Sequence, residues 1–507
     1  MKINQIRAGV LLSYVQIALN LLVSLVYTPV MLRLLGQSEY GIYTLASSTI
    51  AYLGLLNFGL SSSYVRYFTR YRENGDEQGV AQLNAIFLLV YTVIAAVALC
   101  AGLVLAWNVP ALFGEKLTAA ETRTTTVLMV ILSLNLMMTF LTTVFAAYVS
   151  ANERFVFQKL LNICKIFVAP MVSLPLLFLG YRSLGLTIST TAVSVLVDLL
   201  NIWYCFRRLR IRFRLRGADF RLVGEIASYS VFIAINSVVD QINWQVDKFI
   251  LGRYWGALTT AVYGVAAQVN AMYVSVSSAI SSVFVPRVHR ISHMPDRQRH
   301  YTDLMIRLGR IQFLVLGLVA SGLILAGKPF LRMWAGAAYE EAYPILLLLV
   351  LPGTVPLIQN IGIEIQRAEN QHRFRSLAYL IMALFNVAVS IPLGRRWGGV
   401  GCAFGTGLSL LLSNGLIMNW YYARRMHLGI ARFWRELLSV LPAVFLACLL
   451  GWLWLRWMPI RGVMTLAVFS AGFTVLYSAL VWFLSMKSDE KQLVTQMIRK
   501  VRRRARS

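Results

Sequence analysis

The chain has 507 residues, of which 58 % are hydrophobic, and a formal net charge of +27. Apolar stretches of about 18 or more residues, long enough to cross the hydrocarbon core of a bilayer, recur from end to end, which excludes an ordinary soluble globular protein. The basic residues lie in short loops between these stretches. We therefore interpret the charge as a determinant of membrane sidedness and predict no nucleic-acid binding.

The first apolar stretch, residues 9–31, is too long for the hydrophobic region of a signal peptide and predicts a retained first helix. The connecting loops are short, and none is large enough to form a soluble domain. The sequence therefore predicts an all-α polytopic membrane protein with about 14 transmembrane helices. The predicted spans are residues 9–31, 41–64, 83–107, 125–149, 160–180, 184–206, 226–248, 259–285, 308–327, 343–364, 377–394, 399–422, 437–455 and 463–485.

The distribution of lysine and arginine predicts the orientation of these spans. With the N-terminus in the cytoplasm, the cytoplasmic segments carry 35 of the 48 basic residues. Seven arginines lie between Arg207 and Arg221, and six lie between Arg287 and Arg310. This asymmetry indicates an even number of spans with both termini in the cytoplasm.

An internal repeat divides the predicted spans into two groups of six. "SLPL" at 173–176 matches "SIPL" at 390–393, and "NIWYCFRR" at 201–208 matches "MNWYYARR" at 418–425, both at an offset of 217 residues. Because six is even, both copies have the same orientation, which predicts two lobes related by a pseudo-two-fold axis along the membrane normal. Substrate sites in transporters tend to lie between such repeats. The predicted parts are an N-terminal lobe (1–206), a basic cytoplasmic linker (207–225), a C-terminal lobe (226–425), a helix pair (426–486) and a basic tail (487–507).

The tail has an amphipathic pattern. An apolar stripe at helical spacing is flanked by lysines and arginines, which is typical of an interfacial helix on anionic cytoplasmic lipid. A disordered basic tail that only enforces sidedness is an equal alternative. The stripe consists of Leu493, Val494, Met497, Ile498 and Val501.

The seventh span, residues 226–248, carries the main candidate site. Asn236, Asp240, Asn243 and Asp247 follow spacings of four, three and four residues, so they share one helix face. Ionisable groups at membrane depth are costly and usually face a cavity or a partner. We therefore predict a water-filled cavity lined by this face and by the first span, where Asn20 is the counterpart of Asn236. The alternative for Asp247 is that it reaches the outer surface beside Lys248.

Two further charges lie inside predicted spans. Lys165 is about five residues into the fifth span, and Asp198 is at a similar depth in the antiparallel sixth span. In the second copy of the repeat Lys165 becomes Met382, and Asp198 becomes Asn414 or Gly415. This joint absence favours an ion pair between Lys165 and Asp198. The other hypothesis is that Lys165 neutralises an anionic ligand.

Motifs for catalysis or for a cofactor are not found in the sequence. It contains no nucleotide-binding glycine loop, no GxSxG, no HExxH and no CxxC. The five cysteines lie in or at the ends of apolar spans, and the five histidines fall in loops. We therefore predict a transporter that is not an enzyme and that has no cofactor, no metal and no disulfide.

Two regions resemble a known family. "LLGQSEYGIYTL" at 34–45 with "LNFGLSSSYVR" at 56–66, and "DKFILGRYWGALTTAVYGVAAQ" at 247–268, are similar to the polysaccharide flippases, the Wzx/PST-type branch of the multidrug/oligosaccharidyl-lipid/polysaccharide exporter superfamily. The resemblance spans nearly the whole chain. Asn57 departs from it, because many relatives carry an aspartate before the Phe-Gly-Leu. The loss of that carboxylate argues against proton coupling through the second span.

The resemblance implies translocation of a polyprenyl-diphosphate-linked oligosaccharide across the bacterial inner membrane, for synthesis of a cell-surface polysaccharide such as O-antigen or exopolysaccharide. Arg66 and Arg287, near the cytoplasmic mouth, are candidates to attract the diphosphate, with membrane sidedness as their other role. Anionic lipid is an expected partner, as are a polysaccharide polymerase and chain-length proteins. A cation-coupled efflux antiporter of the same superfamily and a membrane glycan polymerase stay open as alternatives.

Overall fold

A computed structural model describes residues 5–217, 221–369, 371–492 and 495. The chain forms two compact units, each built from two segments. One unit consists of Met1–Ala266 and Arg373–Ser409, and the other of Ala267–His372 and Leu410–Ser507. These units follow contacts, whereas the predicted lobes follow sequence repetition, and the division into repeated lobes stays a prediction.

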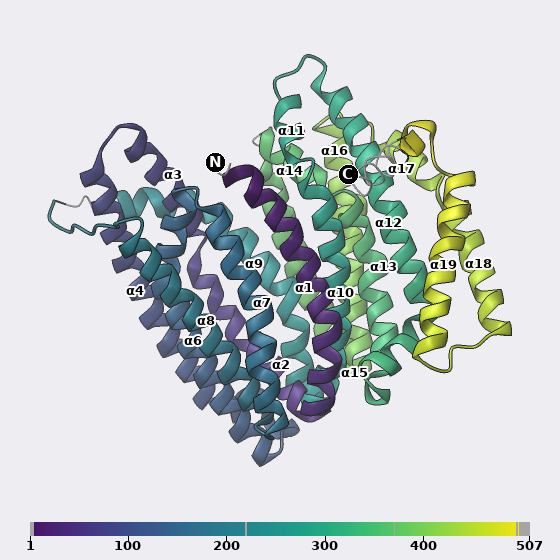
Figure 1. The fold of residues 1–507 in the computed structure, drawn as a ribbon, viewed down its shortest axis with the longest axis horizontal. Coiled ribbons are helices and arrows are strands. Elements are labelled where there is room, and N and C mark those ends of the chain that lie inside the picture. The colour runs from purple at the N-terminus through teal and green to yellow at the C-terminus, as the bar shows by residue number, and fades with distance from the viewer. Residues whose placement is uncertain (1–4, 218–220, 370, 493–494, 496–507) are drawn as a thin grey trace, which may run out of the picture. The chain divides into compact units, whose positions relative to one another are not determined.

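The described part of the chain is helical almost throughout, and every predicted span lies mostly on helix, some of them on two or three consecutive helices (Figure 1). The long helices end at polar residues or at glycines in a left-handed conformation, such as Gly36 after α1 (Gln5–Leu35) and Gly256 after α9 (Arg221–Trp255). The helices are α1 (Gln5–Leu35), α2 (Gln37–Ala51), α3 (Leu60–Glu73), α4 (Glu77–Trp107), α5 (Val109–Phe113), α6 (Ala119–Ala151), α7 (Phe155–Phe178), α8 (Arg182–Arg207), α9 (Arg221–Trp255), α10 (Ala257–Ser282), α11 (Val285–Ile291), α12 (Arg297–Trp334), α13 (Ala342–Ile358), α14 (Ile361–Ala368), α15 (His372–Leu410), α16 (Asn419–Arg424), α17 (Ile430–Leu438), α18 (Leu441–Trp457) and α19 (Val463–Leu484).

Ten helices of the described residues are long and apolar enough to cross a membrane, and a bent pair, α10 with α11, raises the number to eleven. The chain is therefore an all-helical, multi-pass membrane protein. One of the ten runs from Arg373 to Arg424 and has 52 residues. This is about twice the length that a bilayer requires, and it covers two of the predicted spans.

The long helix α15 is a hairpin of two helices. Gly398 has a non-helical conformation, φ 56° and ψ −134°, at which the chain reverses. A Cβ atom at Gly401 would lie 2.1 Å from the Leu393 carbonyl oxygen, and one at Gly405 would lie 2.5 Å from Ser390 Oγ. The two arms therefore pack backbone to backbone, which only glycine permits. The reversal falls between the predicted spans 377–394 and 399–422, as the sequence predicts.

The predicted span at 41–64 is wrong as a single continuous helix. Helix α2 continues as a 3₁₀ turn over Tyr52–Asn57, and Phe58 and Gly59 then take the left-handed conformation, with φ of 46° and 68°. Helix α3 begins at Leu60. Hydropathy does not show this break, because over a window as long as a span the apolar residues on both sides outweigh Asn57 and the serines that follow it.

In the unit that contains the N-terminus, α4 packs against α6, and α6 packs against α8; these helices lie side by side in blue in Figure 1. Aromatic side chains fill the space between them, with the rings of Tyr64 and Phe87 edge to face at 5.0 Å. The Tyr64 hydroxyl donates to Asn84 Oδ1 at 2.5 Å, and Asn84 Nδ2 donates to the Arg212 carbonyl at 3.0 Å. This bond ties the basic segment after α8 to α4.

In the other unit, α12 packs against α13, α17 and α19. Arg310 of α12 is buried with 2 % of its surface exposed and bonds to α17 and to the chain that follows α19. Residues 488–492 are helical. The five residues of the predicted apolar stripe, from Leu493 to Val501, lie outside the described residues.

Candidate functional site

A carboxylate is buried in the unit that contains the N-terminus. Asp247 lies on α9 with 2 % of its surface exposed. Its Oδ2 accepts hydrogen bonds from the hydroxyls of Tyr263 on α10 and Thr406 on α15, the latter at 2.7 Å. The interpretation that Asp247 reaches the outer surface is wrong, because these hydroxyls hold the side chain inside the protein.

The α15 hairpin supplies the other polar groups of the site. Thr406 Oγ1 also lies 3.3 Å from Asn386 Oδ1, and Ser390 Oγ donates to Asn386 Oδ1 at 2.9 Å. Ser390 also interacts with the Asp247 carboxylate. Asn386 and Ser390 are one helical turn apart on the first arm, and Thr406 is on the second. The contact between the arms places all three beside Asp247.

Two polar atoms in this cluster have no hydrogen-bond partner among the described residues. They are Asp247 Oδ1 and Asn386 Nδ2. A buried carboxylate oxygen without a partner is unfavourable unless a proton or a cation neutralises it. The groups around it are carboxylate, amide and hydroxyl oxygens, which are the ligands that small hard cations prefer. The arrangement is chemically suited to binding a proton or such a cation.

Lys248 is the nearest basic residue along the chain, and it acts electrostatically on Asp247. Its Nζ donates to Gln245 Oε1 at 3.1 Å, and no ion pair within 4 Å joins it to Asp247 in the residues that the structure describes. The lysine therefore influences the carboxylate without occupying its free oxygen. In the same residues, no group of three or more His, Cys, Asp or Glu side chains could hold a metal ion.

The remaining residues of the predicted polar face differ in their surroundings. Asn236 is half-buried and bonds through its amide to Ser376 Oγ of α15, at 3.1 and 3.2 Å. Asn243 is half-buried, whereas Asp240 and Asn20 are exposed. The role of these four residues as the lining of a cavity stays a prediction.

Lys165 on α7 and Asp198 on α8 are both half-buried and interact electrostatically. They do not form a direct ion pair within 4 Å in the described structure. Asp198 also interacts with Thr142 of α6. Lys165 is therefore held near a negative charge without contacting it.

Arg66 and Asn57 flank the break between α2 and α3. Arg66 lies on α3 and is exposed. Asn57 Oδ1 accepts a hydrogen bond from the Tyr91 hydroxyl at 2.7 Å, and this hydroxyl also lies 3.1 Å from Ser61 Oγ. Asn57 thus helps to stabilise the break between α2 and α3. The amide oxygen is enough to accept this hydrogen bond, so a carboxylate is not needed for it.

Sequence reasoning missed the partners of Asp247, namely Tyr263, Asn386, Ser390 and Thr406. Uncharged polar residues are common in transmembrane helices, so none of them is conspicuous alone. One sequence feature could have indicated these partners. Asn386 and Ser390 are four residues apart and therefore lie on one face of an apolar span.

The model of the family described as "Polysaccharide biosynthesis protein" matches residues 30–344. The chain belongs to this family. Among curated relatives, it is 20 % identical over 400 residues to the "Putative O-antigen transporter" of Shigella flexneri, covering 77 % of this chain and 91 % of that one. It is also 22 % identical over 511 residues to the "Uncharacterized membrane protein EpsK" of Bacillus subtilis (strain 168), covering 96 % of each chain. The predicted resemblance to polysaccharide exporters is confirmed.

Solved structures share the fold of this family member. The lipid II flippase MurJ, in an inward closed conformation, matches with a TM-score of 0.74 at 15 % identity, covering 93 % of this chain and 98 % of that one. An inward-facing multidrug resistance MATE family transporter matches with a TM-score of 0.60 at 12 % identity, covering 82 % and 96 %. The chain therefore shares the fold of these two transporters.

Proposed function

We propose that the chain is a flippase that moves a polyprenyl-diphosphate-linked oligosaccharide from the cytoplasmic to the outer leaflet of the bacterial inner membrane by alternating access. The observation that carries this proposal is the agreement between two independent properties. The sequence belongs to a polysaccharide biosynthesis family, and nearly the whole chain has the fold of a lipid II flippase. In our proposal the sugar-bearing head is shielded by the protein while the lipid tail stays in the bilayer.

The buried carboxylate supplies a coupling site for this cycle. Asp247 has one oxygen held by two hydroxyls and one oxygen without a hydrogen-bond partner among the described residues. A proton or a small cation such as Na⁺ would neutralise the carboxylate, and its release would favour a different arrangement of α9, α10 and α15. Because these three helices contribute to one cluster, the charge state of Asp247 would bias their packing.

The finer topology belongs to the proposal. It has 14 spans in two six-helix lobes with a C-terminal helix pair, and both termini lie in the cytoplasm. Anionic lipid would contact the basic cytoplasmic face. A polysaccharide polymerase and chain-length proteins would use the translocated product.

A deletion strain tests the proposal directly. We expect it to accumulate lipid-linked oligosaccharide on the cytoplasmic face and to lose surface polysaccharide. The wild-type gene should reverse both changes, and Asp247→Asn should reverse neither while reaching the membrane at normal abundance. Normal surface polysaccharide in the deletion strain, where no second flippase gene is present, would contradict the proposal.

A cation-coupled efflux antiporter is the second candidate, and the fold shared with multidrug transporters favours it. The two functions make opposite predictions for purified protein in proteoliposomes. A flippase moves a fluorescent polyprenyl-diphosphate oligosaccharide between leaflets, whereas an antiporter accumulates a small organic cation such as ethidium. Accumulation of ethidium without movement of the lipid probe would favour the antiporter.

A further inference from the structure

A basic pocket lies between α11 and α12, in the unit made of 267–372 and 410–507. The chain bends by 42° between α10 and α11. Pro286, in the first turn of α11, lacks an N–H and cannot continue the preceding helix, so α11 takes a new direction and packs against α12. The cavity between the two helices has a volume of about 610 Å³, within the range of about 300–1,000 Å³ that ligand sites occupy.

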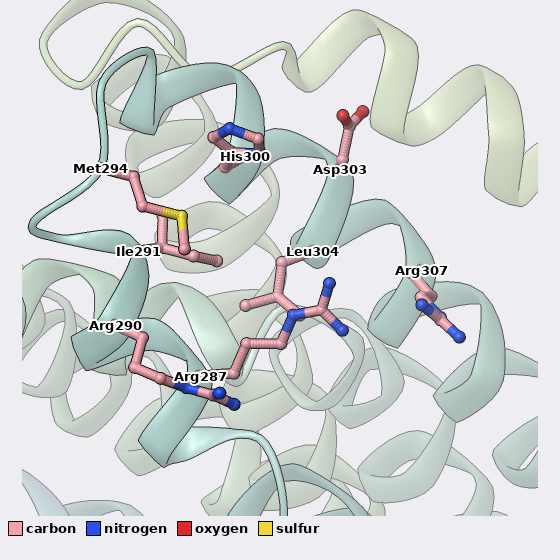
Figure 2. Close-up of a pocket in the computed structure, with 8 residues that line it drawn as sticks. All are labelled: Arg287, Arg290, Ile291, Met294, His300, Asp303, Leu304 and Arg307. Carbon is pink, nitrogen blue, oxygen red and sulfur yellow. The ribbon is translucent and has the colours of Figure 1, made fainter.

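Three arginines line this pocket. Arg287 and Arg290 are three residues apart on α11, and Arg307 lies on α12. In Figure 2, Arg287 extends from α11 toward Leu304 of α12. Since residues three apart share a helix face, the two arginines of α11 are presented on the same side. The pocket therefore receives positive charge from both of its walls.

These three guanidinium groups make no ion pair or side-chain hydrogen bond with the described part of the chain. Other arginines of the same unit are paired: Arg297 lies 3.4 Å from Glu369, and Arg432 lies 2.9 Å from Asp303. Asp303 is the acidic residue that lines the pocket, and Arg432 of α17 already neutralises it. The positive charge of the pocket thus remains available to an external anion.

The floor of the pocket is apolar. Ile291 and Leu304 are buried, and Met294 lies above them with 45 % of its surface exposed. In Figure 2, Met294 extends over Ile291 at one side of the cavity. Guanidinium groups on both walls and apolar side chains beneath them fit a ligand that joins a phosphate group to a hydrocarbon.

We propose that this pocket binds the phosphate group of a lipid. The pocket lies at the polar N-terminal end of α12, next to the start of the apolar run of that helix. Basic pockets between transmembrane helices bind anionic lipid headgroups. The same chemistry has two sources, the diphosphate of a polyprenyl-linked cargo and the phosphate of a bulk anionic phospholipid. The cargo as the source rests on the proposed function, whereas binding of lipid phosphate does not.

The test measures lipid binding by the purified full-length protein in nanodiscs of neutral phosphatidylcholine. The two probes are polyprenyl diphosphate and phosphatidylglycerol, each titrated separately, with inorganic pyrophosphate as competitor. We expect the double variant Arg287→Gln, Arg307→Gln to weaken binding of at least one probe by about tenfold or more, because it removes two charge-assisted contacts to the phosphate group. Arg332→Gln, an exposed arginine at the other end of α12, is the matched control and should change binding less than twofold.

A second variant separates binding from membrane sidedness. Arg287→Lys with Arg307→Lys retains both charges, so insertion is preserved, but it removes the planar fork that bonds phosphate bidentately. We expect this variant to bind the preferred probe about threefold or more weakly than the wild type. Preference for polyprenyl diphosphate identifies the cargo, and equal binding of both probes identifies bulk anionic lipid. Wild-type affinity for both probes in the lysine variant and in the glutamine variant would overturn the proposal. The binding test and the flippase proposal can fail separately, because this experiment measures lipid binding and not transport.

Discussion

Arg310 Nε donates to Glu490 Oε1 at 2.7 Å, and Arg310 Nη2 donates to Glu490 Oε2 at 3.1 Å. This bidentate pair joins α12 to a residue that follows α19, 180 positions along the chain. The other donors of the guanidinium reach the carbonyls of Glu436 and Ser485 and the hydroxyl of Ser439. Arg310 is one of the basic residues from which the sequence predicts membrane sidedness. In the structure it is buried and joins α12 to α17 and to the chain after α19.

Removing one partner of this pair should destabilise the unit that contains it. Glu490→Ala leaves the buried guanidinium without its carboxylate, and breaking a buried pair in this way costs about 3–5 kcal/mol. We expect Tm to fall by several degrees in thermal unfolding of the purified protein. The control is Asp489→Ala, an exposed neighbouring carboxylate. Equal Tm values for the two variants would show that the pair does not stabilise the protein.

The same contact should weaken in acid. Burial by itself raises the pKa of Glu490, but hydrogen bonds from Arg310 and from the Lys487 backbone N–H, with the charges of both residues, lower it below its ordinary 4.5. A depressed folded-state pKa contributes stability that is present above pH 4.5 and is lost as the pH falls through the lower folded value. We expect hydrogen exchange of residues 485–492 to accelerate below that value. Glu490→Gln should abolish this pH dependence of exchange.

The Thr406 hydroxyl should be required for transport, because it is one of the two hydroxyls that donate to Asp247 Oδ2. Thr406→Val keeps the size of the side chain and removes the donor, whereas Thr406→Ser keeps the donor. We expect the valine variant to slow flipping in proteoliposomes about tenfold, and the serine variant to slow it less than threefold. Equal rates for the two variants would mean that the hydroxyl has no role.

Charge reversal tests the relationship between Lys165 and Asp198. Because Asp198 lies beyond ion-pair distance of Lys165, we expect the double variant Lys165→Asp with Asp198→Lys to reach the membrane at wild-type abundance but to show no transport. Abundance is measured by immunoblot of membranes, and transport by the lipid-linked oligosaccharide that accumulates. Recovery of both would instead make the two residues a purely structural pair.

Single cysteines test the proposed orientation. The basic segment after α8 should face the cytoplasm, as the positive-inside rule requires, and the loop before α6 should face outward. In intact cells, a membrane-impermeant thiol reagent should label Thr118→Cys and spare Arg216→Cys. Permeabilised cells, in which both should react, are the control. Labelling of Arg216→Cys in intact cells would reject the orientation.

Hydropathy and length predicted an all-helical, multi-pass protein correctly, because both depend only on composition within a window of residues, but the fourteen spans stay a prediction against the ten or eleven membrane-crossing helices of the described residues. Hydropathy and length did not predict the break in the helix at Phe58 and Gly59. It is set by two left-handed backbone conformations in an apolar sequence, and these become visible only once Asn57, Ser61 and Tyr91 are seen to bond across it.

The candidate site could be predicted only in part. The spacing of Asn236, Asp240, Asn243 and Asp247 identifies a polar helix face, and Asp247 on that face is the centre of the buried cluster. Thr406 is 159 residues away from it, so their contact depends on packing that a single sequence does not specify. Asp198 was similarly recognised as a charge in a span, but its separation from Lys165 depends on the relative positions of α7 and α8.

The glycines of the α15 hairpin set the spacing of the polar groups in the proposed coupling site. Gly401 and Gly405 leave no room for a side chain between the two arms, so the separation of Ser390 from Thr406 is set by direct backbone contact. An alanine at either position would push the arms apart and widen the space beside Asp247. If the cluster binds a cation as we propose, these two glycines would limit the size of the ion that fits, and an alanine there would change the ion preference with every polar ligand still in place.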